Sequence, residues 1–244
     1  MKRPIIPVVG HRGAAALWPE NTMYAFREAE KLGVDGLETD IRMTRDGELV
    51  LCHDERVDRT TDGTGRVCDL SLRELRALDA GRPFCGGPTG LRIPTLEAFL
   101  DWAAGTGLFL NLEIKDARRE TVEKTMRTID RYRLAGRYVI TSFDLEVCRH
   151  VRAEFGAPVQ GFVHGRLIND RPDAYRLFYA VGIGLAELSR ELVRELREEG
   201  LRPWCWCPDT EQQVRRAVDC GAELCTCNDP RPALALLRRE GLHP

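Results

Sequence analysis

Residues 202–241 read RPWCWCPDTEQQVRRAVDCGAELCTCNDPRPALALLRREG and contain the same pattern twice. In each copy, a short apolar run is followed by a segment whose apolar residues recur at helical spacing. The first copy predicts a strand at 202–207 and a helix at 210–221. The second predicts a strand at 222–228 and a helix at 231–241. Strands that alternate strictly with helices indicate a parallel sheet covered by helices.

The same alternation extends back toward the N-terminus. Further strands are expected at 5–11, 35–44, 49–54, 108–115, 138–144, 158–165 and 183–188. Further helices are expected at 21–33, 71–78, 95–105, 120–136, 145–156 and 189–200, and an irregular or helical segment at 173–182. About eight strands in a chain of 244 residues favour a closed α/β barrel of the (β/α)8 type over an open doubly wound sheet.

Residues 54–92 interrupt the alternation. The stretches RTTDGTGRV and DAGRPFCGGPTG are rich in turn-forming residues, and one short helix is expected between them. We therefore expect a single domain over residues 1–244, with a small insertion at 54–92 after the second strand. Nothing in the pattern indicates a second domain.

The composition argues against several classes of protein. With 43% hydrophobic residues and a net charge of −2, the chain has no electrostatic signature of a nucleic-acid partner. No apolar run approaches the roughly 20 residues of a membrane-spanning helix, and the segment MKRPIIPVVGHRG lacks the apolar core of a signal peptide. The nine cysteines lack the spacing of a disulfide framework. We expect a cytoplasmic protein without stable membrane insertion, of undetermined oligomeric state.

Charged side chains lie within two of the expected parallel strands, at 35–44 and 108–115. Glu38 and Asp40 are two residues apart, so their side chains point to one face of the strand. Glu113 and Lys115, in the strand NLEIK, share a face for the same reason. Charges in an apolar strand are costly to bury unless they are paired or bind a metal. These four side chains are therefore candidates for a functional site.

Two histidines are expected near the same site. His11 and Arg12 directly follow the first apolar run, at the strand end where the reactive groups of such barrels lie. If the Asp-Gly pair at 46–47 forms a two-residue turn, the hairpin places His53 opposite Asp40. A longer turn would shift that pairing by a residue or two.

The three carboxylates would repel one another at a barrel mouth unless a cation lay between them. Oxygen ligands of this kind suit Mg²⁺ or Ca²⁺. The alternative is that they form structural salt bridges with Arg12, Arg42 and Lys115. In the same way, His11 and His53 could each be a hydrogen-bonded structural histidine.

Taken in order, residues 10–115 resemble the glycerophosphodiester phosphodiesterase family. The similarity is carried by GHRG, PENT, LETD, LVLCHD, IPTLEAFL and LNLEIK. The resemblance implies a (β/α)8 barrel with a small inserted segment after the second strand. It also implies metal-dependent hydrolysis of small glycerophosphodiesters to sn-glycerol 3-phosphate and an alcohol.

The resemblance further implies roles for the side chains that would act on the substrate. It makes His11 and His53 an acid/base pair, without deciding which is the base and which the acid. It makes Arg12 and Lys115 the groups that hold the phosphate. The nucleophile is water, or the neighbouring glycerol hydroxyl acting through a cyclic phosphate.

The resemblance makes Glu38, Asp40 and Glu113 ligands of a divalent metal, usually Mg²⁺ or Ca²⁺. It also includes Glu20 and Asn21 of the PENT motif as supporting residues. These two have a simpler explanation as well, because PENT is a good start for a helix that an Asn or Thr side chain caps.

The C-terminal half resembles the family more weakly. Trp206, a further supporting residue, keeps its place in a segment where the family carries Trp-Thr-Val-Asn. Cys207 and Asp209 stand at the threonine and asparagine positions of that segment. In the last strand, Cys227 and Asn228 replace a Thr-Asp pair. These departures bear on substrate selectivity more than on the type of reaction.

Two other functions remain open at this stage. A lysophospholipase-D-like phosphodiesterase on the same barrel would need an apolar patch at the mouth, which residues 82–88 or 176–182 could supply. A non-catalytic, zinc-binding structural protein would use the two Cys-x-Cys pairs. Those pairs are Cys205 with Cys207, and Cys225 with Cys227.

Overall fold

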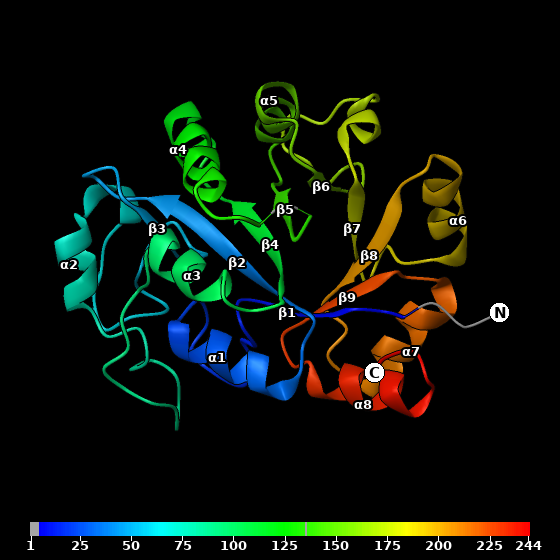
Figure 1. The fold of residues 1–244 in the computed structure, drawn as a ribbon, viewed down its shortest axis with the longest axis horizontal. Helices are drawn as coiled ribbons and strands as arrows, with labels where there is room; N and C mark the ends of the chain where they lie inside the picture. The colour runs from blue at the N-terminus through cyan, green and yellow to red at the C-terminus, as the bar shows by residue number, and fades with distance from the viewer. Residues whose placement is uncertain (1–4, 135) are drawn as a thin grey trace.

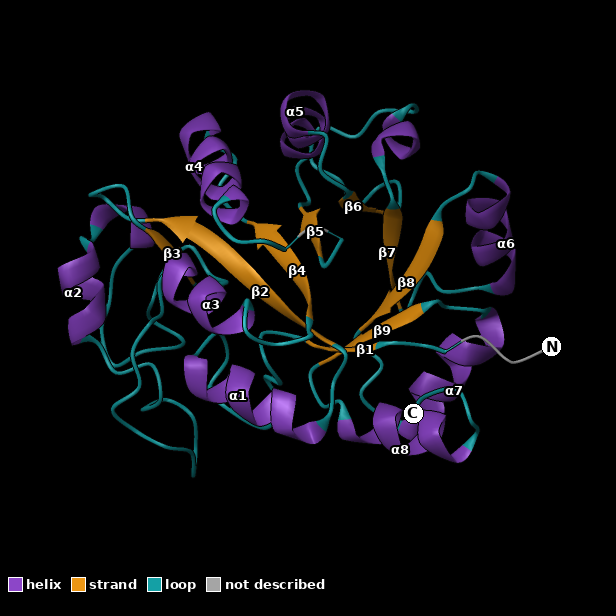
Figure 2. Cartoon of the chain, viewed as in Figure 1, coloured by secondary structure: helices purple, strands orange, loops and turns teal. Residues whose placement is uncertain are grey.

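Eight parallel strands form a closed barrel, as the alternating pattern predicts (Figures 1 and 2). The computed structural model describes residues 5–134 and 136–244. The barrel strands are β1 (Val8–Gly10), β2 (Gly36–Met43), β4 (Phe109–Ile114), β5 (Tyr138–Thr141), β6 (Val159–Phe162), β7 (Ala180–Gly184), β8 (Arg202–Trp206) and β9 (Leu224–Cys227). Because β1 pairs with both β2 and β9, the sheet closes on itself. The predicted (β/α)8 barrel is confirmed.

Helices surround the barrel (Figure 2). They are α1 (Met23–Leu32), α3 (Leu96–Ala103), α4 (Arg119–Asp130), α5 (Leu145–Phe155), α6 (Arg190–Glu198), α7 (Glu211–Cys220) and α8 (Arg231–Arg239). Thr22, Thr95, Ser189 and Thr210 each cap a helix by accepting the backbone N–H three residues later. Among the helices that the structure describes, none combines the length and apolar character needed to cross a membrane.

The apolar core of the barrel has two parts, because successive residues of a strand point to opposite faces. Val8 belongs to the large cluster between strands and helices, whereas Val9 belongs to a smaller cluster inside the barrel. The inner cluster consists of Val9, Val139, Ala180, Trp204 and Leu224. It forms an apolar floor beneath the polar side chains at the C-terminal ends of the strands.

The hairpin formed by β2 and β3 (Leu49–Leu51) differs in register from the prediction. Ile41 lies opposite Leu51, and the backbone N–H of Cys52 donates to the carbonyl of Asp40 at 2.9 Å. The partner of Asp40 is therefore Cys52, and the predicted pairing of Asp40 with His53 is wrong by one residue.

The shift arises because the turn contains three residues rather than the predicted two. The backbone N–H of Thr44 donates to the carbonyl of Glu48 at 2.9 Å. The Thr44 hydroxyl donates to Asp46 Oδ1 at 2.6 Å and accepts from the backbone N–H of Glu48 at 2.8 Å. These side-chain bonds stabilise the wider turn, in which Gly47 has a φ of 79°.

Two further elements differ from their predicted bounds. The strand expected at 183–188 is β7, which begins at Ala180 and ends at Gly184. Its glycines obscure the apolar pattern, and a Cβ on Gly182 would lie 2.6 Å from Gln160 Nε2. The helix expected at 120–136 ends at Asp130, and residue 135 lies outside the described residues.

Residues 54–92 lie between β3 and α3, to one side of the barrel (Figure 1). They contain a short 3₁₀ turn, Val67–Asp69, and helix α2 (Leu72–Ala77), which begins with a capping box between Ser71 and Glu74. The segment packs around a small apolar cluster that it shares with residues of β3 and of the chain on either side. That cluster comprises Val50, Cys52, Val57, Val67, Leu75, Ala80 and Ile93.

Candidate active site

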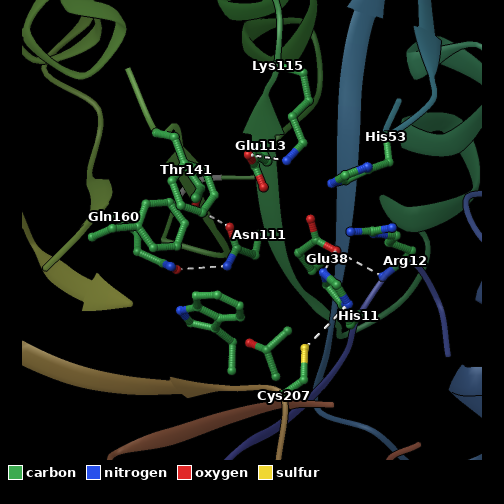
Figure 3. Close-up of a pocket in the computed structure, with 14 residues that line it drawn as sticks. His11, Arg12, Glu38, His53, Asn111, Glu113, Lys115, Thr141, Gln160 and Cys207 are labelled. Carbon is green, nitrogen blue, oxygen red and sulfur yellow. Dashed lines mark hydrogen bonds and ion pairs between the residues drawn. The ribbon is translucent and has the colours of Figure 1, made fainter. Parts of the chain in front are cut away.

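A cavity of about 150 Å³ lies at the C-terminal mouth of the barrel (Figure 3). Seven residues predicted from the sequence line it, namely His11, Arg12, Glu38, His53, Glu113, Lys115 and Trp206. Asp40 is fully buried behind the cavity wall. The barrel thus gathers side chains from the ends of several separate strands.

Glu38 and Asp40 on β2 and Glu113 on β4 form a buried acidic cluster whose ligand atoms lie within 4.8 Å of one another. Burial, together with repulsion from the other two carboxylates, raises the pKa of Glu38 well above its usual range. Burial also raises the pKa of Glu113. Burial opposes ionisation of Asp40 as well, but Lys115 and Arg12 outweigh it and lower the pKa of that carboxyl.

The donor set of this cluster fits a divalent cation with oxygen ligands. Glu38 Oε1 is buried and has no hydrogen-bond partner among the described residues. Within the part of the chain that the structure describes, the acidic cluster is the one group of three or more His, Cys, Asp or Glu ligands. The cysteines considered for zinc do not gather in this way. Cys205, Cys225 and Cys227 are buried in the core between strands and helices.

Two cationic side chains contact the acidic cluster. Arg12 Nε lies 3.4 Å from Asp40 Oδ2. Lys115 Nζ lies 2.6 Å from Glu113 Oε1 and 3.4 Å from Asp40 Oδ1. Burial lowers the pKa of Lys115, but Glu113 and Asp40 outweigh burial and raise it. Two cations balance only part of the charge of three carboxylates, so an additional cation would be attracted to the cluster.

His11, which follows β1, is held at its Nδ1 atom. Nδ1 lies 2.6 Å from Asn228 Oδ1 and 3.6 Å from Cys207 Sγ. The other ring nitrogen, Nε2, lies 3.6 Å from Glu38 Oε2. Burial lowers the pKa of His11, but the contact with Cys207 outweighs burial and raises it. The sequence indicated Asn228 only as a departure from a family motif, not as a partner of His11.

His53, which follows β3, is held in a similar way. Its Nδ1 lies 2.7 Å from Asp54 Oδ1. Its backbone carbonyl accepts hydrogen bonds from Arg42 Nε and Nη2 at 3.0 and 2.8 Å. Arg42 thus binds the His53 backbone rather than the acidic cluster. Burial lowers the pKa of His53 and outweighs the opposing effect of Asp40.

Arg59 links the partner of His53 to the partner of Arg12. Arg59 Nε donates to Asp54 Oδ2 at 2.7 Å, and Arg59 Nη1 donates to Glu20 Oε2 at 2.6 Å. Arg12 Nη1 donates to Glu20 Oε1 at 2.9 Å. Sequence reasoning missed Asp54 and Arg59 as supporting residues, although both lie within six residues of His53. Asp54 ends the strand expected at 49–54, and Arg59 begins the turn-rich stretch RTTDGTGRV.

The PENT motif supports the acidic cluster from behind. Asn21 Nδ2 donates to Asp40 Oδ2 at 2.8 Å, and Asn21 Oδ1 accepts from the Thr39 hydroxyl at 2.7 Å. Thr22, rather than Asn21, caps α1, because its hydroxyl accepts from the Ala25 backbone N–H. Asn21 therefore orients a member of the acidic cluster, while its neighbour starts the helix.

An aromatic wall faces the charged side chains across the cavity. Phe143 and Phe162 stack with ring centroids 3.5 Å apart, and Trp206 meets Phe162 edge-on at 6.2 Å. Lys115 Nζ lies 5.4 Å from the centroid of Phe143. Sequence analysis missed both phenylalanines. Their positions at the C-terminal ends of the strands expected at 138–144 and 158–165 were the available signal.

The segments considered as apolar patches do not enter this cavity. In the stretch 176–182, Leu177 and Phe178 pack against the apolar core, and Phe178 is 8% exposed. In the stretch 82–88, Pro83 and Phe84 line a separate cavity together with Glu20 and Arg59. The aromatic wall is therefore the apolar surface that the mouth offers a substrate.

The fold and the charged cavity at its mouth define the class of protein as a (β/α)8-barrel enzyme. Residues 11–231 match the glycerophosphoryl diester phosphodiesterase family, and the chain belongs to this family. It is 34% identical over 245 residues to a glycerophosphodiester phosphodiesterase of Caldanaerobacter subterraneus subsp. tengcongensis. That similarity covers 96% of this chain and 98% of the relative.

Solved structures agree with this assignment. A crystal structure of a putative glycerophosphoryl diester phosphodiesterase from Silicibacter pomeroyi superposes with a TM-score of 0.89 at 27% identity, over 98% of this chain and 95% of that one. An Oleispira antarctica phosphodiesterase, solved in complex with the product sn-glycerol-3-phosphate, shares the fold with a TM-score of 0.87 at 22% identity. The second similarity covers 96% of this chain and 97% of that one.

Proposed function

We propose that this phosphodiesterase hydrolyses small glycerophosphodiesters to sn-glycerol 3-phosphate and an alcohol, with a divalent metal at the acidic cluster. The observation that carries the proposal is the cluster itself, in which three carboxylates with atoms within 4.8 Å lie beside His11 and Arg12. The name of the Caldanaerobacter relative and the product bound to the Oleispira protein support the choice of substrate.

Glu38, Asp40 and Glu113 would hold Mg²⁺ or Ca²⁺. A bound divalent ion supplies Lewis-acid stabilisation of a non-bridging phosphate oxygen. Glu38 has a buried oxygen without a hydrogen-bond partner among the described residues, as a side chain that awaits a ligand would have. Asn21 keeps Asp40 oriented toward the other two carboxylates.

Arg12 and Lys115 would bind the phosphate of the substrate. Arg12 is already fixed by Glu20 and Asp40, so its planar guanidinium loses little freedom when it meets an anion. Lys115 places a second positive charge beside Glu113 and Asp40. Together these cations reduce the repulsion between an anionic diester and the carboxylates.

His11 and His53 would act as the acid/base pair. Each ring has its Nδ1 engaged, by Asn228 or by Asp54, so Nε2 is the nitrogen left for the substrate. One histidine removes a proton from the nucleophile, and the other protonates the leaving alkoxide. The nucleophile is water or the neighbouring glycerol hydroxyl, the latter acting through a cyclic phosphate.

We take the chain to be one domain of a cytoplasmic protein. Residues 54–92 are taken as an insertion in it, because they pack on a small apolar cluster separate from the main core and bring Arg59 to the site. All nine cysteines are free, which suits a reducing compartment. The expected partner is a small-molecule substrate, with no nucleic acid involved and no stable membrane insertion.

The decisive experiment measures release of glycerol 3-phosphate from a panel of glycerophosphodiesters. We expect turnover of glycerophosphocholine with added Mg²⁺ or Ca²⁺ and loss of turnover in EDTA. Lysophosphatidylcholine is the matched substrate for the alternative activity. Faster cleavage of the lysophospholipid would favour the lysophospholipase-D-like function, and full activity in EDTA would exclude the metal.

A further inference from the structure

Asp209 and Asn228 form a hydrogen-bonded pair behind His11. Asp209 follows β8, and Asn228 follows the neighbouring strand β9. Asn228 Nδ2 donates to Asp209 Oδ2 at 2.8 Å, and the backbone N–H of Asn228 donates to Asp209 Oδ1 at 2.6 Å. The backbone N–H of Asp229 donates to the same oxygen at 3.0 Å. Three donors thus hold the Asp209 carboxylate in place.

This pair determines which way the Asn228 amide faces. An ionised carboxylate can only accept hydrogen bonds, so the amide must turn its NH₂ group toward Asp209. Its oxygen, Oδ1, then faces His11 Nδ1 at 2.6 Å, as the structure shows. The orientation therefore follows from donor and acceptor chemistry as well as from the observed distances.

The orientation of the amide in turn determines the tautomer of His11. Asn228 Oδ1 can only accept, so Nδ1 of the ring must carry the hydrogen. In the neutral ring, the lone pair then lies on Nε2, on the side of Glu38. Cys207 Sγ also approaches Nδ1, but at 3.6 Å it is the more distant partner.

We propose that Asp209 and Asn228 are positioning residues that fix His11 as the Nδ1–H tautomer, so that Nε2 exchanges protons with the substrate. The exchange of protons rests on the proposed function, whereas the tautomer does not. The two histidines have chemically different supports, because His53 Nδ1 faces the carboxylate of Asp54 and His11 Nδ1 faces an uncharged amide.

The pair permits a reciprocal test. In Asn228→Asp the NH₂ donor is lost and two carboxylates face each other, so the support of His11 is disrupted. In the double variant Asp209→Asn/Asn228→Asp, one amide and one carboxylate are restored with their places exchanged. The amide oxygen at position 209 can accept from the two backbone N–H groups, and the carboxylate at 228 can accept from His11. Every hydrogen bond of the original arrangement is then satisfied.

We expect Asn228→Asp to lower kcat for glycerophosphocholine about 100-fold with little change in KM, because the ring is displaced or reoriented. The double variant is expected to recover kcat to within about fivefold of the parent, since the two substitutions are coupled. Asn169→Asp is the matched control. Asn169 Nδ2 also donates to an aspartate, Asp144 Oδ1 at 3.2 Å, but away from His11. It should leave kcat nearly unchanged.

The tautomer is read independently by ¹⁵N NMR of histidine-labelled protein, at a pH where the ring is neutral. His11→Gln assigns the His11 resonances by their loss. We expect the Nδ1–H pattern in the parent and in the double variant.

An Nε2–H pattern in the parent, or a double variant no more active than Asn228→Asp, would overturn the proposal. If Asn228→Asp does not fold, the parent spectrum and the double variant still decide the question. Absence of diesterase activity would refute the proposed function without affecting the tautomer result.

Discussion

At the scale of single residues, the site contains more buried carboxylates than cations, and Lys115 and Arg12 offset part of the negative charge. Lys115 bridges Asp40 and Glu113, and Arg12 bridges Asp40 and Glu20. These contacts keep Asp40 ionised, whereas burial and mutual repulsion raise the pKa of Glu38. Such an arrangement costs stability in the absence of a further cation and provides a strong attraction for one.

Replacing Glu38 with Gln is expected to separate stability from function. In EDTA, loss of the buried carboxylate should raise the free energy of unfolding by about 1 kcal/mol, since repulsion by Asp40 and Glu113 is removed. Calorimetry should show weaker binding of Mg²⁺ or Ca²⁺, and turnover should fall. Thermal denaturation in EDTA, with and without the substitution, measures the stability change. A lower melting temperature for the variant would contradict this account.

Replacing His11 with Ala should lower kcat by about 10²–10⁴-fold, the range for loss of a general acid or base. Steady-state release of glycerol 3-phosphate measures the effect, and circular dichroism checks the fold. His164→Ala is the control, because His164 is exposed and its ring contacts Asp170 and Tyr175 rather than the cavity. Unchanged turnover in folded His11→Ala would refute the role of this histidine.

At the scale of elements, the site depends on the short segments that follow the strands, and the turn after β1 has an unusual backbone conformation. After β1 the chain turns sharply, with Gly13 at a φ of 92°. A Cβ on Gly10 would lie 1.9 Å from the carbonyl oxygen of Gly13. Residues 54–92 add a second support, because Arg59 connects Asp54 beside His53 to Glu20 beside Arg12. These contacts explain why Gly10, Gly13 and Arg59 stand at their positions, which secondary-structure patterns alone do not explain.

Gly13→Ala is expected to destabilise the fold by about 2 kcal/mol or more, because the new Cβ adds strain at a positive φ. It would also lie 2.7 Å from the Ala25 Cβ. Urea denaturation measures the change. Gly107→Ala is the control, since a Cβ there meets nothing within 4 Å. Equal stabilities for the two variants would show that the turn after β1 is more tolerant than the structure indicates.

Arg59→Ala should destabilise the protein by about 1 kcal/mol near pH 7, a modest value because the guanidinium is half exposed. Burial raises the pKa of Glu20, but Arg59 and Arg12 outweigh it and lower the pKa. A carboxyl with a lowered folded-state pKa stabilises the fold above its unfolded pKa, and the stabilisation disappears as the pH falls through the folded value.

The difference in unfolding free energy between the parent and Arg59→Ala should therefore shrink as the pH is lowered from 7 to 3. Urea titrations at several pH values measure it. Arg56→Ala is the matched control, because Arg56 in the same segment pairs with the exposed Asp58. A constant difference at all pH values would mean that Arg59 acts through packing rather than through its carboxylate partners.

At the scale of the whole molecule, closure of the barrel assembles the site. Parallel alignment places Asp40 opposite Glu113, and the pairing of β1 with β9 brings His11 to Asn228. These partners are 217 residues apart in the chain. The apolar floor formed by the inner cluster lies beneath them. The two histidines, the cations and the aromatic wall therefore share one small cavity, although no two adjacent elements contain them all.

Much of this arrangement was predictable from local patterns. The alternation of strands and helices depends on apolar periodicity within each segment, and the shared face of Glu38 and Asp40 follows from the two-residue repeat of a strand. The bounds of β7 were not predictable in this way, because Gly182 and Gly184 give no apolar signal. The hairpin register was missed as well, since it depends on side-chain bonds made by Thr44.

The sequence by itself determined the fold class, the family and the histidine and charged side chains that gather at the mouth, because these depend on periodicity and on short ordered motifs. Only the tertiary structure decided how those side chains are supported. Asp54 and Arg59 beside His53, and Asp209 and Asn228 beside His11, belong to loops whose contacts arise when the strands assemble. The physical reason is that hydrogen bonds between distant loops depend on register and on barrel closure, and neither is encoded in any single segment.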